Sequence, residues 1–252
     1  MLRLILVLFF AVAYLILTIP VLVVEWIIGK FNPHMKYISS LRMIQWIFKI
    51  LLWGSGLKLD VIGEENIPKD QAVLYIGNHR SFYDVIITYS RCPGLTGYVA
   101  KKEMLKIPLL SIWMKYLHCH FLDRKDLKQG LKMILSCIDD IKHGISICIF
   151  PEGTRSKGET ETPLLPFHEG SFKIAQKTGC PIVPMALVNT NQILEAHFPR
   201  IKSTHVILEY GEPIIPSGLS PEDRKHMGDY TKKRIEEMLE KNRKLLSEDS
   251  KS

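Results

Sequence analysis

The beginning of the chain has a hydrophobic pattern of its own. Residues 4–24 form a run of 21 residues without a charged side chain, which is long enough to cross a bilayer. A cleaved signal peptide has a shorter apolar region followed by small residues, whereas Glu25, Trp26 and Lys30 follow here. We therefore expect a retained, membrane-associated segment. The pattern leaves open full crossing or entry into one leaflet, and the alternative is a core helix of a soluble domain.

The next segment has apolar residues at helical spacing and polar residues on the opposite side. The apolar positions are Leu41, Ile44, Ile47, Phe48, Leu51 and Leu52, and the polar positions are Arg42, Gln45 and Lys49. This pattern predicts a helix that lies in the membrane interface. We accordingly expect residues 1–57 to form a membrane-anchoring unit of helices.

From Leu57 onward, short apolar runs alternate with amphipathic segments, which predicts an α/β domain with a mixed sheet flanked by helices. The expected strands are 72–76, 97–100, 145–150, 182–188 and 205–210, and the expected helices are 82–90, 103–115, 126–142 and 171–177. We place this domain at residues 58–220. Ser220 and Pro221 are start signals for a further helix, so residues 221–252 are expected to form a charged helix and tail with a solvated face.

Composition and cysteine use narrow the class of protein. The chain has 252 residues, of which 46% are apolar and 23% charged, and its mean hydropathy is +0.07. These values exclude a disordered, collagen-like or multi-span membrane protein. The five cysteines are an odd number and form no Cys-x-x-Cys pair, so neither a disulfide framework nor a zinc ribbon is indicated. We expect a reducing compartment.

The net charge of +7 is concentrated in two regions. Residues 1–57 hold five basic residues against Glu25 alone, and basic groups beside an apolar segment favour the cytoplasmic side and anionic headgroups. We expect the cytoplasmic face of a membrane, the inner membrane if the source is bacterial. Residues 98–132 carry eight basic against three acidic side chains, a patch suited to a phosphorylated lipid headgroup or, alternatively, a solvated helix face. No nucleic-acid partner is expected.

His79 and Asp84 form a His-x4-Asp pattern, and a carboxylate beside an imidazole orients it and makes it a better base. The spacing alone is weak evidence, because His118 and Asp123 repeat it. His79, however, follows an apolar run that ends at Gly77, and Ser81 can cap a helix that begins at Phe82. This setting places His79 on a strand-to-helix turn, whereas His118 lies in an alternating segment and is interpreted as structural.

A second strand-end turn follows residues 145–150. Here Pro151 and Glu152 precede Gly153, Thr154 and Arg155. An arginine beside glycine and hydroxyl residues at such a turn can hold a phosphate through its guanidinium and the backbone N–H groups. The alternative is an ordinary turn with a surface arginine.

These motifs occur in one order along the chain: Asn78-His79-x4-Asp84, Lys101, Phe121-Leu122-Asp123-Arg124, Phe150-Pro151-Glu152-Gly153-Thr154-Arg155-Ser156 and Val183-Pro184. The series resembles the glycerolipid acyltransferase family, in particular 1-acylglycerol-3-phosphate acyltransferases of the PlsC type, from about residue 58 to 215. One position departs from the family pattern, because His118 stands where a glycine usually lies six residues before the motif arginine.

The resemblance implies a role for each matching residue. His79 is the general base that takes the proton of the acceptor hydroxyl, which attacks an acyl thioester without an acyl-enzyme, and Asp84 holds the other ring nitrogen. Acceptor phosphate binding falls to Lys101, Arg124 and Arg155, and the pocket is shaped by Glu152, Gly153 and Thr154. No cofactor is implied beyond acyl carrier protein or coenzyme A as the carrier of the acyl co-substrate.

The expected function is therefore acylation of the 2-hydroxyl of lysophosphatidate to phosphatidate on a phospholipid membrane. Two alternatives stay open: the acceptor is another lysophospholipid or an amine-linked lipid, or the protein is a non-catalytic lipid-binding adaptor. His118-Cys119-His120 invites a metal interpretation, but the sequence shows no further cluster of ligands beside it. No metal is predicted, and none of the cysteines is assigned a catalytic role.

Overall fold

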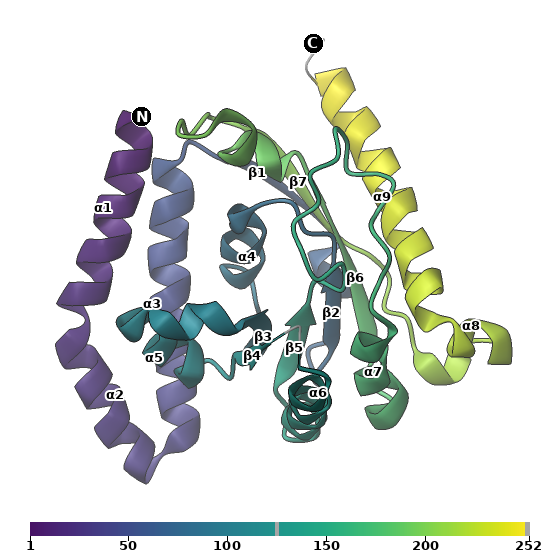
Figure 1. Cartoon of the computed structure of the whole chain (residues 1–252), viewed down its shortest axis with the longest axis horizontal. Coiled ribbons are helices and arrows are strands. Elements are labelled where there is room, and N and C mark those ends of the chain that lie inside the picture. Colours follow the sequence, from purple (N-terminus) through teal and green to yellow (C-terminus); the bar gives the residue numbers. More distant parts are fainter. Residues whose placement is uncertain (124–125, 250–252) are drawn as a thin grey trace.

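The computed structural model describes residues 1–123 and 126–249. Its centre is a seven-stranded sheet in the order β1-β7-β6-β2-β5-β3-β4 (Figure 1). The strands are β1 (Lys58–Ile62), β2 (Leu74–Gly77), β3 (Thr96–Lys101), β4 (His120–Leu122), β5 (Ser146–Ile149), β6 (Ile182–Val188) and β7 (His205–Tyr210). Neighbouring strands are parallel except for the antiparallel pair β6 and β7. The expected α/β fold with a mixed sheet is confirmed.

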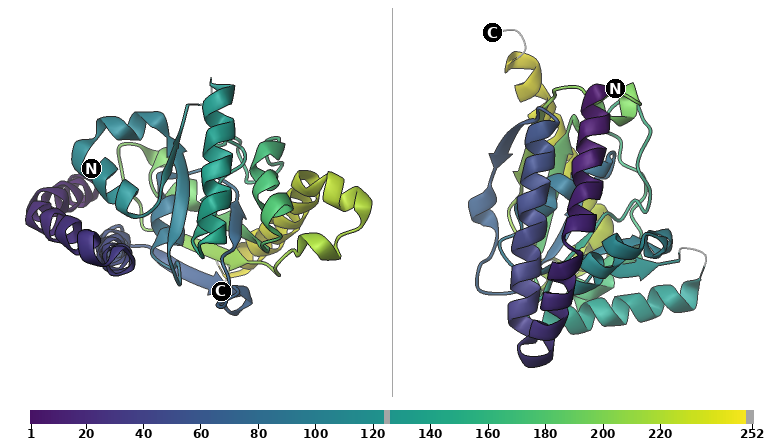
Figure 2. Two further views of the ribbon diagram at one scale, coloured as in Figure 1. Left: turned by 90° about the horizontal axis from the view of Figure 1, so that it is seen from below. Right: turned by 90° about the vertical axis from the view of Figure 1, so that its left-hand side faces the viewer.

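Helices cover both faces of this sheet (Figures 1 and 2). They are α1 (Leu2–Leu17), α2 (Ile19–Phe31), α3 (Pro33–Gly54), α4 (Phe82–Tyr89), α5 (Pro108–Tyr116), α6 (Leu127–Lys142), α7 (Lys173–Thr178), α8 (Pro221–Lys225) and α9 (Met227–Asp249). In β2, Tyr75 belongs to the core shared with α3, α4 and α5, whereas Leu74 and Ile76 belong to the core shared with α6, α7 and α9. Because side chains alternate along a strand, the central strands are buried on both sides.

Several elements differ from the sequence prediction. The single helix expected over 103–115 is a 3₁₀ helix, Lys102–Lys106, followed by α5. Pro108 separates them, since proline has no N–H to continue the first helix and suits the start of the next. The two edge strands, β1 and β4, were not predicted. Their side chains are exposed or half-buried, so neither has the apolar run that marks a central strand.

The N-terminal apolar segment is bent rather than continuous. Helices α1 and α2 meet at an angle of 48°, and within residues 1–123 and 126–249 no single helix is long and apolar enough to cross a membrane, although this bent pair passes the test by length and composition. Thr18 lies at the bend and donates its hydroxyl to the Tyr14 carbonyl, and Pro20 follows in the first turn of α2.

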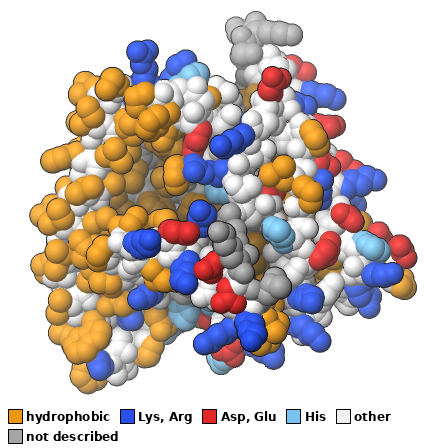
Figure 3. Space-filling view, in the orientation of Figure 1, with side chains coloured by type: hydrophobic (Ala, Val, Ile, Leu, Met, Phe, Trp, Pro, Cys, Tyr) orange, Lys and Arg blue, Asp and Glu red, His pale blue; other side chains and the backbone are white. Residues whose placement is uncertain are grey.

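Much of the surface of α1 and α2 is apolar and exposed, which excludes the alternative of a buried core helix. The exposed side chains include Leu2, Ile5, Leu6, Leu8, Phe9, Phe10, Val12, Ile16, Leu17, Ile19, Val23, Val24, Trp26, Ile27 and Phe31. They gather on one side of the molecule (Figure 3). Soluble monomers rarely expose a continuous apolar surface of this kind without a binding function.

The apolar face of α3 was expected to lie in the membrane interface, and that prediction is wrong. Leu41, Ile44 and Leu51 are buried in the core that α3 shares with α4 and α5. Gln45, expected on the polar side, is also buried, and its amide donates to the carbonyl of Cys92 at 2.7 Å. The helix therefore attaches α1 and α2 to the α/β domain, as Figure 2 shows at one end of the molecule.

The C-terminal helix begins as predicted, since the Ser220 hydroxyl accepts a hydrogen bond from the N–H of Asp223. The helix breaks at His226, and α9 lies against β6 and β7. Met227, Ile235 and Leu239 are buried on its inner side. The predicted solvated face is thus the outer side only, and α9 supplies one wall of the sheet core.

Candidate active site

The first functional turn joins the central strand β2 to helix α4. Asn78 fixes the end of the strand, because its amide exchanges two hydrogen bonds with the backbone of Leu187 in β6, at 2.8 and 2.9 Å. Helix α4 then starts with a capping box in which the Ser81 hydroxyl accepts from the N–H of Tyr83 and the Asp84 carboxylate accepts from the N–H of Ser81. These local bonds satisfy the first N–H groups of the helix and place Asp84 beside the preceding turn.

His79 and Asp84 meet as the sequence predicts. The Nδ1 of His79 lies 2.8 Å from the Oδ2 of Asp84. That oxygen also accepts from the backbone N–H groups of Arg80 and Ser81, each at 2.7 Å. Because an ionised carboxylate only accepts hydrogen bonds, Nδ1 carries the proton and Nε2 of the neutral ring is the basic nitrogen. The pair can therefore act as an oriented general base.

The imidazole is held from a second side by Phe150. The two rings are stacked with centroids 4.5 Å apart and an angle of 17° between their planes. The side chain of His79 is 19% exposed, whereas that of Asp84 is 1% exposed. The imidazole is thus fixed in position yet partly accessible from outside, as proton transfer to or from a substrate requires.

The second turn, after β5, contacts the first one directly. Glu152 is buried, and its carboxylate accepts from the N–H of His79 at 2.8 Å and from the N–H of Leu165 at 3.1 Å. The N–H of Ser156 donates to the carbonyl of His79 at 2.8 Å. Burial raises the pKa of Glu152, partly offset by these two N–H donors and by His79. Glu152 therefore holds the turn that carries His79 in place rather than facing the solvent.

The remaining residues of this turn have different roles. Gly153 has φ of +69°, and a Cβ there would lie 2.9 Å from Nε2 of His168, so both the backbone and the space favour glycine. Thr154 is exposed. Arg155 lies over the ring of Phe82, at the start of α4, with its guanidinium carbon 3.8 Å from the ring centroid. The structure thus brings Arg155 to the same helix terminus that presents Asp84.

Two other residues, Lys101 and Arg124, are predicted to bind the acceptor phosphate. Lys101 is exposed at the carboxyl end of β3, two strands from β2 in the sheet order and therefore roughly 10 Å along the same edge. Its neighbour Lys102 lies 3.5 Å from a carboxylate oxygen of Asp123. Arg124 lies outside the described residues, so its predicted role stays a prediction.

Sequence reasoning missed the buried ion pair between Arg80 and Glu161. The guanidinium of Arg80 lies 3.3 Å from a Glu161 oxygen and also donates to the carbonyl of Gly158. Arg80 is 3% exposed, although it was interpreted only as a residue within the His-x4-Asp motif. Its partners are about 80 residues away along the chain, so no local pattern could have indicated them.

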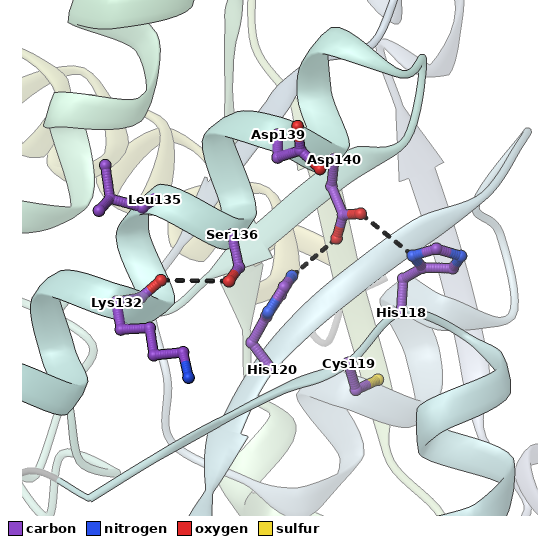
Figure 4. A pocket seen from close by; sticks show the side chains of 8 residues that line it. All are labelled: His118, Cys119, His120, Lys132, Leu135, Ser136, Asp139 and Asp140. Carbon is purple, nitrogen blue, oxygen red and sulfur yellow. Dashed lines mark hydrogen bonds and ion pairs between the residues drawn. The ribbon is translucent and has the colours of Figure 1, made fainter.

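In the second His-x4-Asp occurrence, His118 bonds a carboxylate from outside that pattern, and its structural interpretation stays a prediction. His118 and His120 each hydrogen-bond one oxygen of Asp140 in α6, at 3.1 and 2.7 Å (Figure 4). Burial tends to raise the pKa of Asp140, but the hydrogen bonds and charges of both histidines prevail and lower it to about 2. The three residues line a cavity of about 380 Å³ that does not include His79.

The departure from the family pattern at His118 has a structural explanation. His118 has φ of +56°, a left-handed conformation that few non-glycine residues adopt. Its backbone carbonyl also passes close to Gly97, where a Cβ would lie 2.3 Å from that oxygen. The bond to Asp140 and an edge-on ring contact with Tyr37 at 4.4 Å hold the imidazole in this conformation.

The other nucleophiles and metal ligands give no competing site. The described cysteines are free, and burial raises the pKa of Cys92 to about 11 and that of Cys148 well above its usual value. Neither thiol is therefore a ready nucleophile. Within the part of the chain that the structure describes, no group of three or more histidine, cysteine or carboxylate side chains could hold a metal ion.

The site thus combines a mixed α/β sheet, a His–Asp pair at the turn after β2, and a Glu-Gly-x-Arg turn after the neighbouring strand β5. The Acyltransferase family model matches residues 58–188, which is about half of the chain. The chain belongs to the Acyltransferase family.

Two relatives and one solved structure are similar to this chain. The chain is 38% identical to a 1-acyl-sn-glycerol-3-phosphate acyltransferase of Borreliella burgdorferi over 60% of each chain. It is 32% identical to a protein of the same name from Haemophilus influenzae over 73% of this chain and 77% of that one. The crystal structure of the 1-acyl-sn-glycerophosphate acyltransferase PlsC from Thermotoga maritima matches with a TM-score of 0.78 and 24% identity over 95% of both chains, which establishes the shared fold. The match to the Borreliella protein covers 60% of that protein's length, which is less than two thirds.

Proposed function

We propose that this protein transfers a fatty acyl group from a thioester to the 2-hydroxyl of lysophosphatidate and so forms phosphatidate. The observation that carries the proposal is the bond of 2.8 Å between Nδ1 of His79 and Asp84, which leaves Nε2 as the base. Relatives named 1-acyl-sn-glycerol-3-phosphate acyltransferase support the choice of acceptor.

In the proposed reaction, Nε2 of His79 takes the proton of the acceptor hydroxyl as its oxygen attacks the thioester carbonyl. The ester C–O bond forms, the C–S bond breaks, and the imidazolium returns the proton to the departing thiolate. Asp84 stabilises the imidazolium through Nδ1–H. No acyl-enzyme and no metal or cofactor take part, and the thiol carrier is acyl carrier protein or coenzyme A.

The acceptor phosphate is assigned to Arg155, with Lys101 and Arg124 as further cations of the same site. A guanidinium binds phosphate through two parallel hydrogen bonds. Arg155 lies beside the amino terminus of α4, where the helix dipole also favours an anion. The placement of Arg155 near the His–Asp pair supports a phosphomonoester acceptor over one without a phosphate.

The exposed apolar surface of α1 and α2 is proposed to enter the cytoplasmic leaflet of a phospholipid membrane. Trp26 and Phe31 are exposed on α2, and Lys30 lies over the ring of Trp26 with its Nζ 4.6 Å from the centroid. Aromatic rings and basic groups beside an apolar face are typical of a membrane interface. Such a position gives the enzyme direct access to lipid acceptors.

The test is release of free thiol from acyl carrier protein and coenzyme A thioesters with lysophosphatidate present or absent. We expect thiol release that depends on lysophosphatidate and yields phosphatidate. The donor comparison identifies the carrier, and a panel of acceptors with and without a phosphomonoester identifies the acceptor class. Thioester turnover on other lysophospholipids or amine-linked lipids alone would reject the proposed acceptor, and lipid binding without turnover would reject the enzyme.

A further inference from the structure

Glu195 reaches the catalytic turn from a distant part of the chain. It lies in a 3₁₀ helix, Glu195–His197, that follows β6, and it is outside the residues matched by the family model, 58–188. Its side chain is 24% exposed. No sequence motif pointed to this residue.

The Glu195 carboxylate connects the two functional turns. One oxygen accepts from the N–H of Phe82 at 2.8 Å and from Nη1 of Arg155 at 3.1 Å. The other oxygen accepts from the hydroxyl of Ser81 at 2.7 Å. Ser81 and Phe82 are the cap and first residue of α4, so the carboxylate is bound to the terminus of the helix that carries Asp84.

These contacts leave part of the Arg155 guanidinium available. The ring of Phe82 lies under its plane, and Nη1 is bound to Glu195. Nε and Nη2 make no hydrogen bond to another residue within the part of the chain that the structure describes, and the side chain is 37% exposed. A guanidinium has five N–H donors in a rigid plane, so Arg155 can bind an oxyanion through this second edge while it keeps its bond to Glu195.

We propose that Glu195 is a positioning residue that orients Arg155 toward the acceptor phosphate and fixes this anion site relative to His79 and Asp84. The inference rests on the proposed function. Glu195 would thereby set the distance between the phosphate and the attacking hydroxyl of the acceptor, which matters because small misplacements of a reacting group cost large factors in rate.

An opposite role for Glu195, as an internal competitor of the phosphate, disagrees with its other contacts. If the phosphate displaced this carboxylate, the Ser81 hydroxyl and the N–H of Phe82 would lose their acceptor. Ser81 is buried, so leaving its hydroxyl without an acceptor is costly. Glu195 therefore stays in place when the acceptor binds. If Glu195 positions Arg155, its removal raises the KM for lysophosphatidate, whereas if it competed with the phosphate, its removal would lower that KM.

The experiment is a double-mutant cycle with Glu195→Ala, Arg155→Ala and the double variant, measured with lysophosphatidate and with monoacylglycerol, which has no phosphate. We expect Glu195→Ala to raise the KM for lysophosphatidate about tenfold, the effect of one charge-assisted hydrogen bond, with a much smaller change in kcat. The KM for monoacylglycerol should not change. In the Arg155→Ala background, Glu195→Ala should add no further increase, because the two residues act as one unit.

Glu195→Gln separates positioning from folding, since its amide oxygen can still accept from the N–H of Phe82. We expect a smaller rise in KM than for Glu195→Ala and an unchanged Tm. Glu222→Ala is the matched control, because the side chain of Glu222 is 84% exposed. A lowered KM, an equal rise for both acceptors, or an additive cycle would overturn the inference while the wild type still turns over lysophosphatidate. No turnover by the wild type would overturn the proposed function as well.

Discussion

The backbone N–H of His79 donates to the carboxylate of Glu152 across 2.8 Å, so the proposed base and the Glu-Gly-x-Arg turn form one rigid unit. The two residues are 73 positions apart in the sequence. They meet because β2 and β5 are parallel neighbours and the carboxyl ends of parallel strands lie at the same edge of a sheet. Glu152 thus holds the backbone of the turn that carries His79.

Substitution of Glu152 should impair both stability and rate. In Glu152→Ala the N–H groups of His79 and Leu165 lose their acceptor, at a cost of about 1–3 kcal/mol for each buried group. Glu152→Gln retains one acceptor oxygen and should be less affected. Urea unfolding together with kcat checks this expectation, and Glu159→Ala, in an exposed position, is the control. An unchanged free energy of unfolding in Glu152→Ala would contradict the role of Glu152 in holding the backbone of the His79 turn.

His79→Ala should remove acyl transfer while membrane binding persists. Loss of a general base typically lowers the rate about 10²–10⁴-fold, so kcat should fall by at least 10²-fold. Asp84→Asn should also lower kcat, because an amide can donate to Nδ1 and favour the wrong tautomer of the ring. The measurement is single-turnover phosphatidate formation by purified protein in mixed micelles.

His143→Ala is the matched control for this pair, since the side chain of His143 is 69% exposed at the end of α6. It should retain wild-type turnover. Turnover retained in purified His79→Ala protein would exclude the proposed mechanism.

Asp140 should stabilise the fold in a manner that depends on pH. Its pKa is about 2 in the folded chain and 3.8 without the protein environment. A lowered folded pKa means that the stabilisation is complete above the unfolded pKa and is lost as the pH falls through the folded one. A difference of one between the folded and unfolded pKa corresponds to about 1.4 kcal/mol, so the full effect is on the order of 2 kcal/mol, as an upper value for a partly exposed group.

The comparison of wild type with Asp140→Asn checks this expectation. Urea unfolding midpoints should differ at pH 7, and the difference should shrink as the pH is lowered from 5 to 3. A difference that stays constant over this range would show that the carboxylate charge has no part in the stabilisation. Asp139→Asn is the neighbouring control, because that side chain is 72% exposed.

The apolar surface of α1 and α2 should govern binding to vesicles. Phe9 and Phe31 are 63% and 86% exposed, and withdrawal of one such side chain from an apolar phase costs about 1.5–3 kcal/mol. Each of Phe9→Glu and Phe31→Glu should therefore weaken binding to vesicles that contain anionic phospholipid by roughly tenfold or more. The measurement is the fraction of protein that floats with the vesicles.

Leu131→Glu is the control for these variants, since Leu131 is 61% exposed on α6, away from the N-terminal helices (Figure 2). It should float with the vesicles as the wild type does. Equal loss of binding in all three variants would point to a general effect of added negative charge instead of insertion of the α1–α2 surface.

Features that depend on neighbours along the chain could be predicted from the sequence. The central strands were predictable from their apolar runs, since they are buried on both sides of the sheet. The meeting of His79 and Asp84 was predictable too, because a cap at Ser81 fixes the geometry within one helical turn. The bend at Thr18 was not predicted, because the uncharged run of residues 4–24 continues across it.

Contacts between groups that are distant along the chain could not be predicted in this way, because they depend on how the strands and helices pack. Asp140 lies 22 residues from His118, and Glu195 lies 114 residues from Ser81. The buried side of α3 depended equally on packing, because an apolar face fits a protein core and a membrane interface alike. Hydrophobic periodicity indicates which side of a helix or strand is withdrawn from water. Which residues that side contacts depends on the packing of the strands and helices.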